Sequence, residues 1–581
     1  MNWISLALAV GLAFTYQSIP VLGRVICCGE FEAISASEFV AHLSPGWNLG
    51  NSLDAVPNED SWNNEPITES TFDDVKNAGF NSVRIPVTWA YHFTGNSDEG
   101  DSPDWTVDPA WLQRVHDVVN MVTSRHMSAI INIHHDSTLW ADYTAPNANI
   151  TMIEEKFYRL WYQIGEELAC TGSRVAFEPL NEPQGATNEY AAQLTKLNDI
   201  FQLALTHSGG FNRQRVVALS GPLQDIDATI EWFRKPAPNY TNPYFLQVHY
   251  YEPRNFTSAA WGKTTWGSKE EKNQLEDSFS LLRHKFPDIP ILIGEWLVSP
   301  VMSEPAARWQ YYDFIGRMCA KYKFACMIWD TGNDILDRNA RTLFDSTGLQ
   351  VHLNALKGIT NSLPWATTKP DTEGEYSSAL IFHRIDDLDD LVSNRICYFD
   401  FNGNNVTTIA VDRQLLTEGP DYFISSTAIT FHPSFLSNYF NSSSEEGVKA
   451  TALVSFSTGA RIPIQLIVWD APTVPVASSA AEAGSEVPIA INWNGFPQPA
   501  AVAAFKADGT PLVDEWTNYL PPLNRGRTVF GAHWTWSRGD NVITITGNTT
   551  RVAVEANQEV TFMIEVYPRI GNNYVNYTLT V

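Results

Sequence analysis

Basic residues are scarce in this chain of 581 residues, because 38 Lys and Arg stand against 65 Asp and Glu and the formal net charge is −27. A negative charge of this size repels nucleic acid and anionic membranes, so neither is an expected partner. A neutral ligand fits this composition better. Aromatic residues, in contrast, make up 12% of the chain, and the 20 Trp are more than a core usually requires.

The chain has no apolar run long enough to cross a bilayer. Ile4–Phe14 is uncharged and apolar, but it has only the length of a signal-peptide core. We therefore expect a signal peptide at residues 1–23 and a secreted, extracellular protein, although no Lys or Arg precedes the run. Seven N-x-S/T sequons fit the surface of a secreted glycoprotein and lie at Asn149, Asn239, Asn255, Asn405, Asn441, Asn548 and Asn576.

Cysteine is also rare, with six residues at positions 27, 28, 170, 319, 326 and 397. Disulfides are possible in an extracellular protein. Cys319 and Cys326 are the expected pair because they are close in the sequence, while the connectivity as a whole stays open.

Metal-binding motifs are missing too, since there is no H-E-x-x-H helix and no zinc knuckle. The exception to consider is His134-His135-Asp136. Adjacent residues of a strand face opposite sides, so His134 and His135 are not expected to bind one ion from that strand. We expect His135 to be a hydrogen-bonded histidine beside the pocket, and we expect no metal and no organic cofactor.

Eight short β-rich runs alternate with amphipathic helical stretches over residues 46–330. The runs are about 40 residues apart, a suitable length for one βα unit. Most are continuously apolar, as is typical of strands buried on both faces. The pattern predicts a (β/α)₈ TIM barrel, with strands that start near Gly46, Val83, Ala129, Val175, Val216, Tyr244, Pro290 and Ala325.

The helices between these runs can also be recognised in the sequence. Asp108 is a helix N-cap, followed by Pro109 at the first helical position. Apolar residues then recur at helical spacing in two successive units: Leu112, Val115, Val119 and Val122, then Ile153, Phe157, Leu160, Ile164 and Leu168.

After Pro364 the long helical periodicity stops, and two β-rich units follow a linker. Turn signals at Asn402-Gly403 and Thr458-Gly459 indicate a β-sandwich in the first unit. We expect a multidomain chain in which a TIM barrel is followed by two β-sandwich domains. The predicted boundaries are 35–365, 376–470 and 485–581.

Two glutamates occupy the positions that matter most for chemistry in such a barrel. Glu182 follows the fourth strand and Glu295 ends the seventh, and catalytic groups of TIM barrels lie at these carboxyl ends. Paired carboxyl groups on either side of a glycosidic bond are what its hydrolysis needs, one as proton donor and one as nucleophile or base. The sequence therefore predicts a glycosidase site.

Other strand ends supply supporting groups. Arg84 on the second strand would keep a nearby carboxylate ionised. His249 and Tyr251 follow the sixth strand at alternate positions and so share one face; we expect Tyr251 to donate to the nucleophile and His249 to orient the proton donor. Trp329, after the eighth strand, is expected to form a platform for the apolar face of a sugar.

The motifs GWNLGN, VRIPVTW, INIHH, NEP, HYY, GEW and IWD occur in that order. Over residues 40–360 the chain resembles glycoside hydrolase family 5, a family of (β/α)₈ retaining glycanases, and most closely its endo-β-1,4-glucanase branch. This resemblance implies Glu182 as acid/base and Glu295 as nucleophile of a double displacement. It implies a substrate-binding set of Arg84, His134, Asn181, His249, Tyr251 and Trp329, with Asn181 on the sugar 2-hydroxyl.

The resemblance also extends to the trailing units, which look like an immunoglobulin-like X2 module and a carbohydrate-binding module of the family 46 kind. If the mechanism is retaining, the two carboxyl groups should be about 5–5.5 Å apart. The expected substrates are cellulose-like, xyloglucan or mixed-linkage β-glucans, and the expected state is a monomer.

Alternatives remain for the function and for several tryptophans. A β-mannanase or exo-β-glucanase would share the catalytic pair, and a non-catalytic carbohydrate-binding wall protein is less favoured because both glutamates are present.

Trp534 and Trp536 form either a sugar-stacking platform or part of a sandwich core. Four more tryptophans either line glucose subsites or pack under loops: Trp140, Trp261, Trp266 and Trp296.

Overall fold

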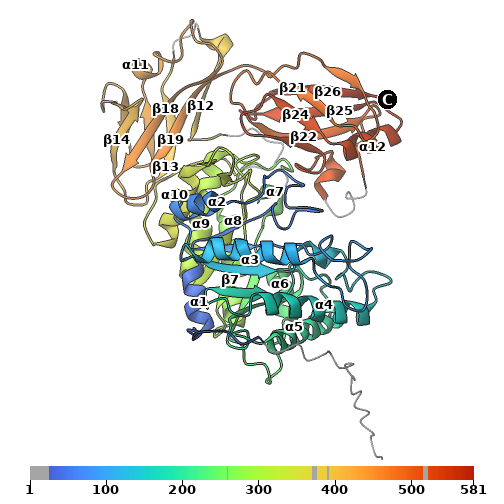
Figure 1. Cartoon of the computed structure of the whole chain (residues 1–581). Helices are drawn as coiled ribbons and strands as arrows, with labels where there is room; N and C mark the ends of the chain where they lie inside the picture. Colours follow the sequence, from blue (N-terminus) through green and yellow to red (C-terminus); the bar gives the residue numbers. More distant parts are fainter. Residues whose placement is uncertain (1–24, 258–259, 369–375, 389–391, 515–520) are drawn as a thin grey trace, which may run out of the picture.

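The computed structural model describes residues 25–257, 260–368, 376–388, 392–514 and 521–581, so the expected signal peptide at 1–23 lies outside the described residues. Figure 1 shows a barrel in the lower half and two β-rich units above it. Within the described residues no helix is both long and apolar enough to cross a membrane.

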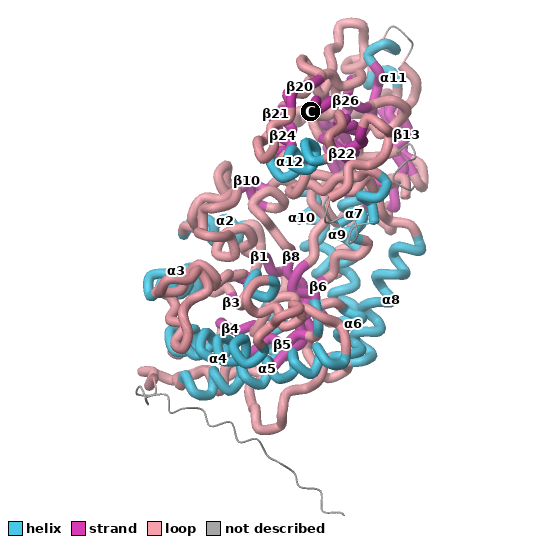
Figure 2. The backbone as a smooth tube through the Cα atoms, turned by 90° about the vertical axis from the view of Figure 1, so that its right-hand side faces the viewer, coloured by secondary structure: helices cyan, strands magenta, loops and turns pink. Residues whose placement is uncertain are grey.

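Eight parallel strands close into a barrel in chain order, which confirms the predicted TIM-barrel fold. In Figure 2 these strands lie at the centre of the lower part, with helices around them. Each strand begins within one residue of the expected position. The strands are β1 (Gly46–Asn48), β2 (Ser82–Ile85), β3 (Ser128–Asn132), β4 (Val175–Glu178), β5 (Val217–Ser220), β6 (Tyr244–His249), β7 (Ile291–Glu295) and β8 (Phe324–Ile328).

The expected helix N-cap at Asp108 is confirmed. Asp108 accepts a hydrogen bond from the Ala110 backbone N–H at 2.9 Å, and Pro109 is the first residue of its helix, as expected. The helices of this unit are α1 (Ala36–Leu43), α2 (Glu69–Asn77), α3 (Pro109–Thr123), α4 (Ile150–Glu167), α5 (Asn188–Ser208), α6 (Ile226–Trp232), α7 (Arg254–Thr257), α8 (Lys269–Lys285), α9 (Pro305–Tyr322) and α10 (Ser346–Leu356). A hairpin of β9 (Leu336–Asp337) and β10 (Thr342–Leu343) follows β8.

The interior of the barrel is apolar at one end and polar at the other. Helix α1 packs its buried residues, Phe39 and Leu43 among them, against apolar side chains of the barrel strands, and Phe39 stacks on Phe245 of β6 with 5.9 Å between ring centroids. Arg84 and Glu178 are fully buried near the carboxyl ends of β2 and β4. This end of the barrel can therefore hold charged groups away from water.

The second unit is a sandwich of two sheets, with strand orders β11-β13-β17-β16 and β12-β19-β18-β14-β15. Asn402 and Gly403 both have positive φ, 53° and 85°, as the predicted tight turn requires. The elements are β11 (Leu363–Pro364), β12 (Leu380–Arg384), β13 (Arg395–Asp400), β14 (Val406–Val411), β15 (Gln414–Leu415), β16 (Tyr422–Ile424), β17 (Ala428–Phe431), α11 (Pro433–Leu436), β18 (Gly447–Phe456) and β19 (Ile462–Trp469).

The third unit pairs a sheet of order β20-β26-β25-β22 with one of order β21-β24-β23. Trp534 and Trp536 are buried, with 1% and 5% of their surface exposed, so the interpretation as a sugar platform is wrong and both belong to the core. The elements are β20 (Ser478–Ala480), β21 (Val487–Ala490), β22 (Pro499–Lys506), β23 (Trp534–Trp536), β24 (Val542–Ile545), α12 (Gly547–Glu555), β25 (Val560–Val566) and β26 (Tyr574–Thr580).

Two predicted boundaries miss short strands. Strand β11 pairs with β13 of the second unit, although it precedes the expected start at residue 376. Strand β20 pairs with β26, although it precedes the expected start at residue 485. Both strands are two or three residues long and are defined by backbone pairing, which leaves little trace in the sequence.

The third unit is docked on loops at the carboxyl end of the barrel. Ala260, Val301 and Met302, which follow β6 and β7, are buried in the same apolar cluster as the core of the third unit. Gln498 Nε2 also donates to the Ser303 carbonyl at 3.4 Å. The unit is therefore fixed beside the end of the barrel where the candidate site lies.

The expected disulfide between Cys319 and Cys326 is wrong. The disulfide joins Cys27 to Cys170 across 143 residues of sequence, and Cys319 and Cys326 are buried free thiols. Their proximity in sequence reflects the short connection from α9 to β8, where Cys326 Sγ lies 3.9 Å from His352 Nε2. Fold closure, rather than sequence distance, brings the paired cysteines together.

Candidate active site

Glu182 and Glu295 face one another at the carboxyl end of the barrel. Glu295 is the last residue of β7, and Glu182 lies four residues beyond the end of β4. One carboxylate oxygen of each lies within 4.8 Å of the other, together with a ring nitrogen of His249. The Glu295 side chain is 7% exposed and the Glu182 side chain 42%, so Glu182 is on the open side of the pair.

Arg84 donates hydrogen bonds to several residues of the site, Glu295 among them. Its Nη1 donates to Glu295 Oε1 at 2.6 Å, while Nε and Nη2 form a two-point contact with Glu178 at 2.7 and 2.8 Å. The same guanidinium donates to Asn181 Oδ1 at 2.7 Å. Burial alone lowers the pKa of Arg84, but the charges of Glu178 and Glu295 raise it above its usual value, so the cation is permanent.

Tyr251 and His249 bind the two glutamates from the end of β6. The Tyr251 hydroxyl donates to Glu295 Oε2 at 2.8 Å, and burial together with the charge of Glu295 raises the pKa of this phenol well above its usual value. Tyr251 is thus a neutral donor. His249 Nδ1 lies 2.8 Å from Glu182 Oε1 and 3.6 Å from Glu295 Oε2.

The protonation of Glu182 depends on His249. Burial raises the pKa of the Glu182 carboxyl group, but the hydrogen bond and the charge of His249 lower it, and the net shift is below the usual value. His249 Nδ1 can donate to the ionised Glu182 carboxylate or accept from the protonated acid, so this contact is compatible with both states of Glu182.

The backbone of Glu182 is strained and is held by Gln224. Glu182 has a φ of 38°, in a region that side-chain-bearing residues rarely adopt. Its N–H donates to Gln224 Oε1 at 2.8 Å, and Gln224 Nε2 donates to Glu178 Oε1 at 3.1 Å. A single buried amide therefore links the position of Glu182 to the Arg84–Glu178 ion pair.

His134 and Trp329 form another wall of the site. Their rings are parallel within 6°, with 5.8 Å between centroids, and Trp329 is only partly buried. Burial, followed by the charges of nearby His135, Arg84 and His249, lowers the pKa of His134 well below its usual value. Asn132 Nδ2 donates to His134 Nδ1 at 3.0 Å, so the neutral ring carries its proton on Nε2.

His134 and His135 do not lie on a strand, so the expectation that they face opposite sides and cannot bind one ion does not apply. Both residues lie beyond the end of β3, and His135 begins the 3-10 helix His135–Thr138. Ring nitrogens of both and a carboxylate oxygen of Asp54 come within 4.8 Å of one another, so the alternation of a strand does not apply to them. In the part of the chain that the structure describes, the other such group is Glu182, His249 and Glu295, which hydrogen bonds already connect.

The four loop tryptophans are packed rather than open to a ligand. At most 8% of the surface of each residue is exposed, and the four are Trp140, Trp261, Trp266 and Trp296. The packing alternative therefore holds for all of them.

Three residues of the site were not singled out from the sequence. Glu178 is a charged residue in an otherwise apolar strand, which is a usable signal for a buried ion pair. Asp330, whose Oδ2 accepts from the Trp47 indole at 2.8 Å, shapes the loop after β8. Gln224 lies in the loop after β5 and has no periodic or charge signal.

A (β/α)₈ barrel that presents paired glutamates at the ends of its fourth and seventh strands has the architecture of a glycoside hydrolase. Residues 46–335 match the family model described as cellulase (glycosyl hydrolase family 5), and residues 377–466 match the carbohydrate binding domain X2. The chain belongs to glycosyl hydrolase family 5, and it is a glycoside hydrolase of the cellulase type.

Relatives and solved structures agree with this assignment. Endoglucanase A of Ruminococcus albus is 31% identical over 355 residues, which cover 55% of this chain and 92% of that protein. Endoglucanase B of Paenibacillus lautus is 27% identical over 500 residues and 83% of both chains. A tri-modular family 5 (subfamily 4) endo-β-1,4-glucanase from Bacillus licheniformis is similar in structure, with a TM-score of 0.78, 29% identity, and coverage of 94% of this chain and all of that one.

Proposed function

We propose that this protein is a retaining endo-β-1,4-glucanase in which Glu182 is the acid/base and Glu295 the nucleophile. The observation that carries the proposal is that one oxygen of each carboxylate lies within 4.8 Å of an oxygen of the other. Retaining enzymes place these groups about 5–5.5 Å apart, whereas inverting enzymes leave about 6.5–9.5 Å for a water molecule. The short approach of the two oxygens favours the retaining arrangement.

The surroundings of the two glutamates support different roles. Arg84 and Tyr251 both donate to Glu295, and these two hydrogen bonds fix the orientation of this carboxylate for attack. Glu182 is the more exposed and contacts His249 instead. Its position on the open side suits a group that exchanges a proton first with the leaving oxygen and then with water.

The reaction then has two steps. Glu182 gives its proton to the glycosidic oxygen as Glu295 attacks the anomeric carbon, so the C–O bond breaks and a glycosyl-enzyme ester forms. Glu182 next removes a proton from water, whose oxygen attacks the same carbon and releases Glu295. Two inversions give net retention. Asn181 is held by Arg84 beside the pair and is the proposed contact of the sugar 2-hydroxyl.

The proposed substrates are β-1,4-linked glucans, including cellulose-like, xyloglucan and mixed-linkage chains. The names of the relatives, which are endoglucanases and endo-β-1,4-glucanases, support this class. The half-buried indole of Trp329, backed by His134, offers a platform for the apolar face of a glucose ring.

We further propose that the enzyme is secreted and acts as a monomer on a neutral polysaccharide, without nucleic acid or membrane partners. The Cys27–Cys170 disulfide supports an oxidising compartment. The net charge of −27 supports the absence of polyanionic partners.

Turnover of carboxymethyl cellulose, xyloglucan, lichenan and mannan, with sizing of the products, tests the substrate and the endo mode. Glu295→Gln and Glu182→Gln should each lower kcat on the preferred β-glucan by at least about a thousandfold, and added azide should restore Glu295→Ala as an inverted glycosyl azide. Exposed Glu189 on α5 provides the matched control, and Glu189→Gln should retain full activity. Proton NMR of the first product should show the β-anomer; an initial α-anomer contradicts the mechanism, and a preference for mannan contradicts the substrate.

A further inference from the structure

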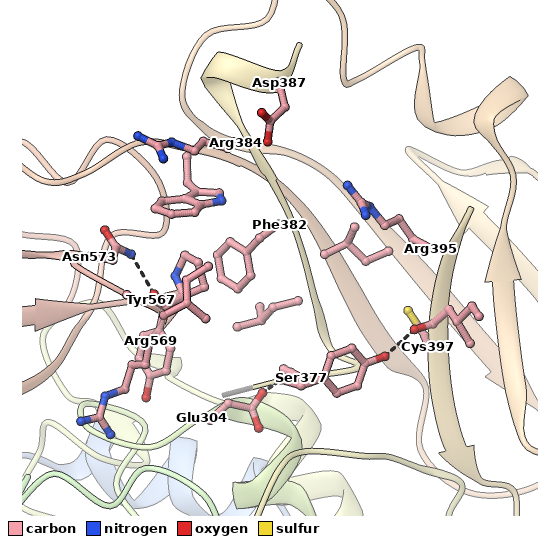
Figure 3. A pocket seen from close by; sticks show the side chains of 18 of the residues that line it. Glu304, Ser377, Phe382, Arg384, Asp387, Arg395, Cys397, Tyr567, Arg569 and Asn573 are labelled. Carbon is pink, nitrogen blue, oxygen red and sulfur yellow. Dashed lines mark hydrogen bonds between the residues drawn. The ribbon is translucent and has the colours of Figure 1, made fainter. Parts of the chain in front are cut away.

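A cavity of about 920 Å³ lies where the three units meet. Figure 3 shows Arg384 and Asp387 of the second unit at its top and Glu304 and Ser377 at its base, with Tyr567 and Arg569 of the third unit on the left. It is separate from the pair Glu182 and Glu295, neither of which lines it.

Both walls of this inter-unit cavity are tied to the barrel. Glu304 caps α9 by accepting from the backbone N–H groups of Ala306 and Ala307, and it also accepts from the Ser377 hydroxyl of the second unit. Arg569 of the third unit donates to the Gly262 carbonyl of the barrel. The space is thus built by anchored segments.

Aromatic side chains stay uncovered along the approach to the cavity. Tyr376 and Tyr398 line it and are 40% and 38% exposed, and Trp365 beside them is 42% exposed. Ring centroids are 5.6 Å apart from Trp365 to Tyr398 and 6.3 Å apart from Tyr398 to Tyr376. Uncovered aromatic rings in a row offer apolar faces to a ligand while their polar edges still reach hydrogen-bonding groups.

Two arginines of the second unit line the cavity, and each has a polar partner. Arg384 pairs with Asp386 and Asp470 at 3.1 and 3.5 Å, and Arg395 Nη2 contacts His383 Nδ1 at 3.0 Å. Arg384 is therefore paired with carboxylates, whereas Arg395 donates to an imidazole nitrogen and keeps its positive charge.

Two polar atoms of the lining are shielded from solvent and have no hydrogen-bond partner among the residues that the structure describes. They are Nε of Arg395, a donor, and Oδ1 of Asn573, an acceptor. Asn573 as a whole is only 6% exposed. A pocket with aromatic faces, a guanidinium donor and an amide acceptor suits a ligand rich in hydroxyl groups.

We propose that the inter-unit cavity binds a β-glucan chain and holds the polysaccharide on the enzyme outside the catalytic site. The identity of the sugar rests on the function proposed above, whereas the location rests on the contacts of the cavity. Tyr398 is the central ring of the row and its principal stacking group.

Affinity electrophoresis of the full chain in gels containing xyloglucan or lichenan tests the proposal, in a Glu295→Gln background to prevent hydrolysis. Tyr398→Ala should weaken retardation by about fivefold, as the loss of one aromatic contact implies, while Tyr398→Phe should keep it. Phe423 on β16 of the same sheet is 53% exposed and does not line the cavity, so Phe423→Ala is the matched control and should migrate like its parent.

In the active chain, Tyr398→Ala should raise KM for the polysaccharide by about fivefold with kcat unchanged, and it should leave turnover of cellotetraose unchanged. Unaltered retardation and KM overturn the cavity proposal, and so does an equal loss on cellotetraose, because the residue then acts through the fold. A wrong catalytic assignment gives a different result: Glu295→Gln with Tyr398 intact would then still turn over the polysaccharide.

Discussion

Arg84 Nη1 lies 2.6 Å from Glu295 Oε1, and neither side chain is more than 7% exposed. The same guanidinium neutralises Glu178, which is fully buried. One cation therefore serves two carboxylates, and its removal leaves both without compensation in a medium where charge is costly.

Arg84→Met should destabilise the protein by about 3–5 kcal/mol near neutral pH. Burial raises the pKa of Glu178, but Arg84 lowers it below its usual value, so the stabilisation is present above the unfolded-state pKa and is lost as the pH falls through the folded-state value. The variant should therefore approach the wild type in stability on acidification. Denaturant unfolding at pH 7 and pH 4 measures this, and a gap that widens at pH 4 contradicts it.

His249 should set the alkaline limb of the activity profile. In the proposed mechanism Glu182 must be protonated to cleave the bond, so kcat/KM should fall as the pH rises through its pKa. His249 lowers that pKa against the effect of burial. In His249→Ala the limb should move to higher pH, while the maximal kcat/KM falls on the order of a hundredfold.

Tyr251→Phe is the control for this profile. It removes the hydroxyl that donates to Glu295 and leaves the contact between His249 and Glu182 in place. Its alkaline limb should stay where the wild type has it, even though activity falls. If the alkaline limb moves equally in His249→Ala and Tyr251→Phe, the shift comes from a general disturbance of the site and not from His249.

The fold and the place of the candidate site in it could be predicted because they depend on patterns that repeat. Apolar runs at regular spacing give the barrel, and Glu182 and Glu295 follow from their places at strand ends. Gln224 could not be predicted, because its role arises only when two loops meet around Glu178 and Glu182. The same holds for the Cys27–Cys170 pair and for the burial of Trp534, since three-dimensional closure decides which distant residues touch.

The Cys27–Cys170 disulfide should contribute about 2–5 kcal/mol to stability. It joins residues 143 positions apart, so its loss frees a long loop in the unfolded chain. Cys170→Ala should lower the midpoint of denaturant unfolding, and dithiothreitol should act on the wild type in the same direction. Cys28 is exposed and free, so Cys28→Ser is the adjacent control. Equal unfolding midpoints for the wild type, Cys28→Ser and Cys170→Ala would contradict a stabilising disulfide.

Gly50 should be needed for the position of Trp329. A Cβ atom at residue 50 would lie 2.6 Å from Trp329 Cζ2 and 2.9 Å from the Asp330 carbonyl oxygen, so either the indole or the backbone must shift. Because misplacement by about 1 Å costs up to a hundredfold in rate, Gly50→Ala should lower kcat/KM on β-glucan by about ten- to a hundredfold, mainly through KM. Gly172 has no atom within 4 Å of such a Cβ, so Gly172→Ala should retain activity. An unchanged KM in Gly50→Ala means that Trp329 does not bind the sugar.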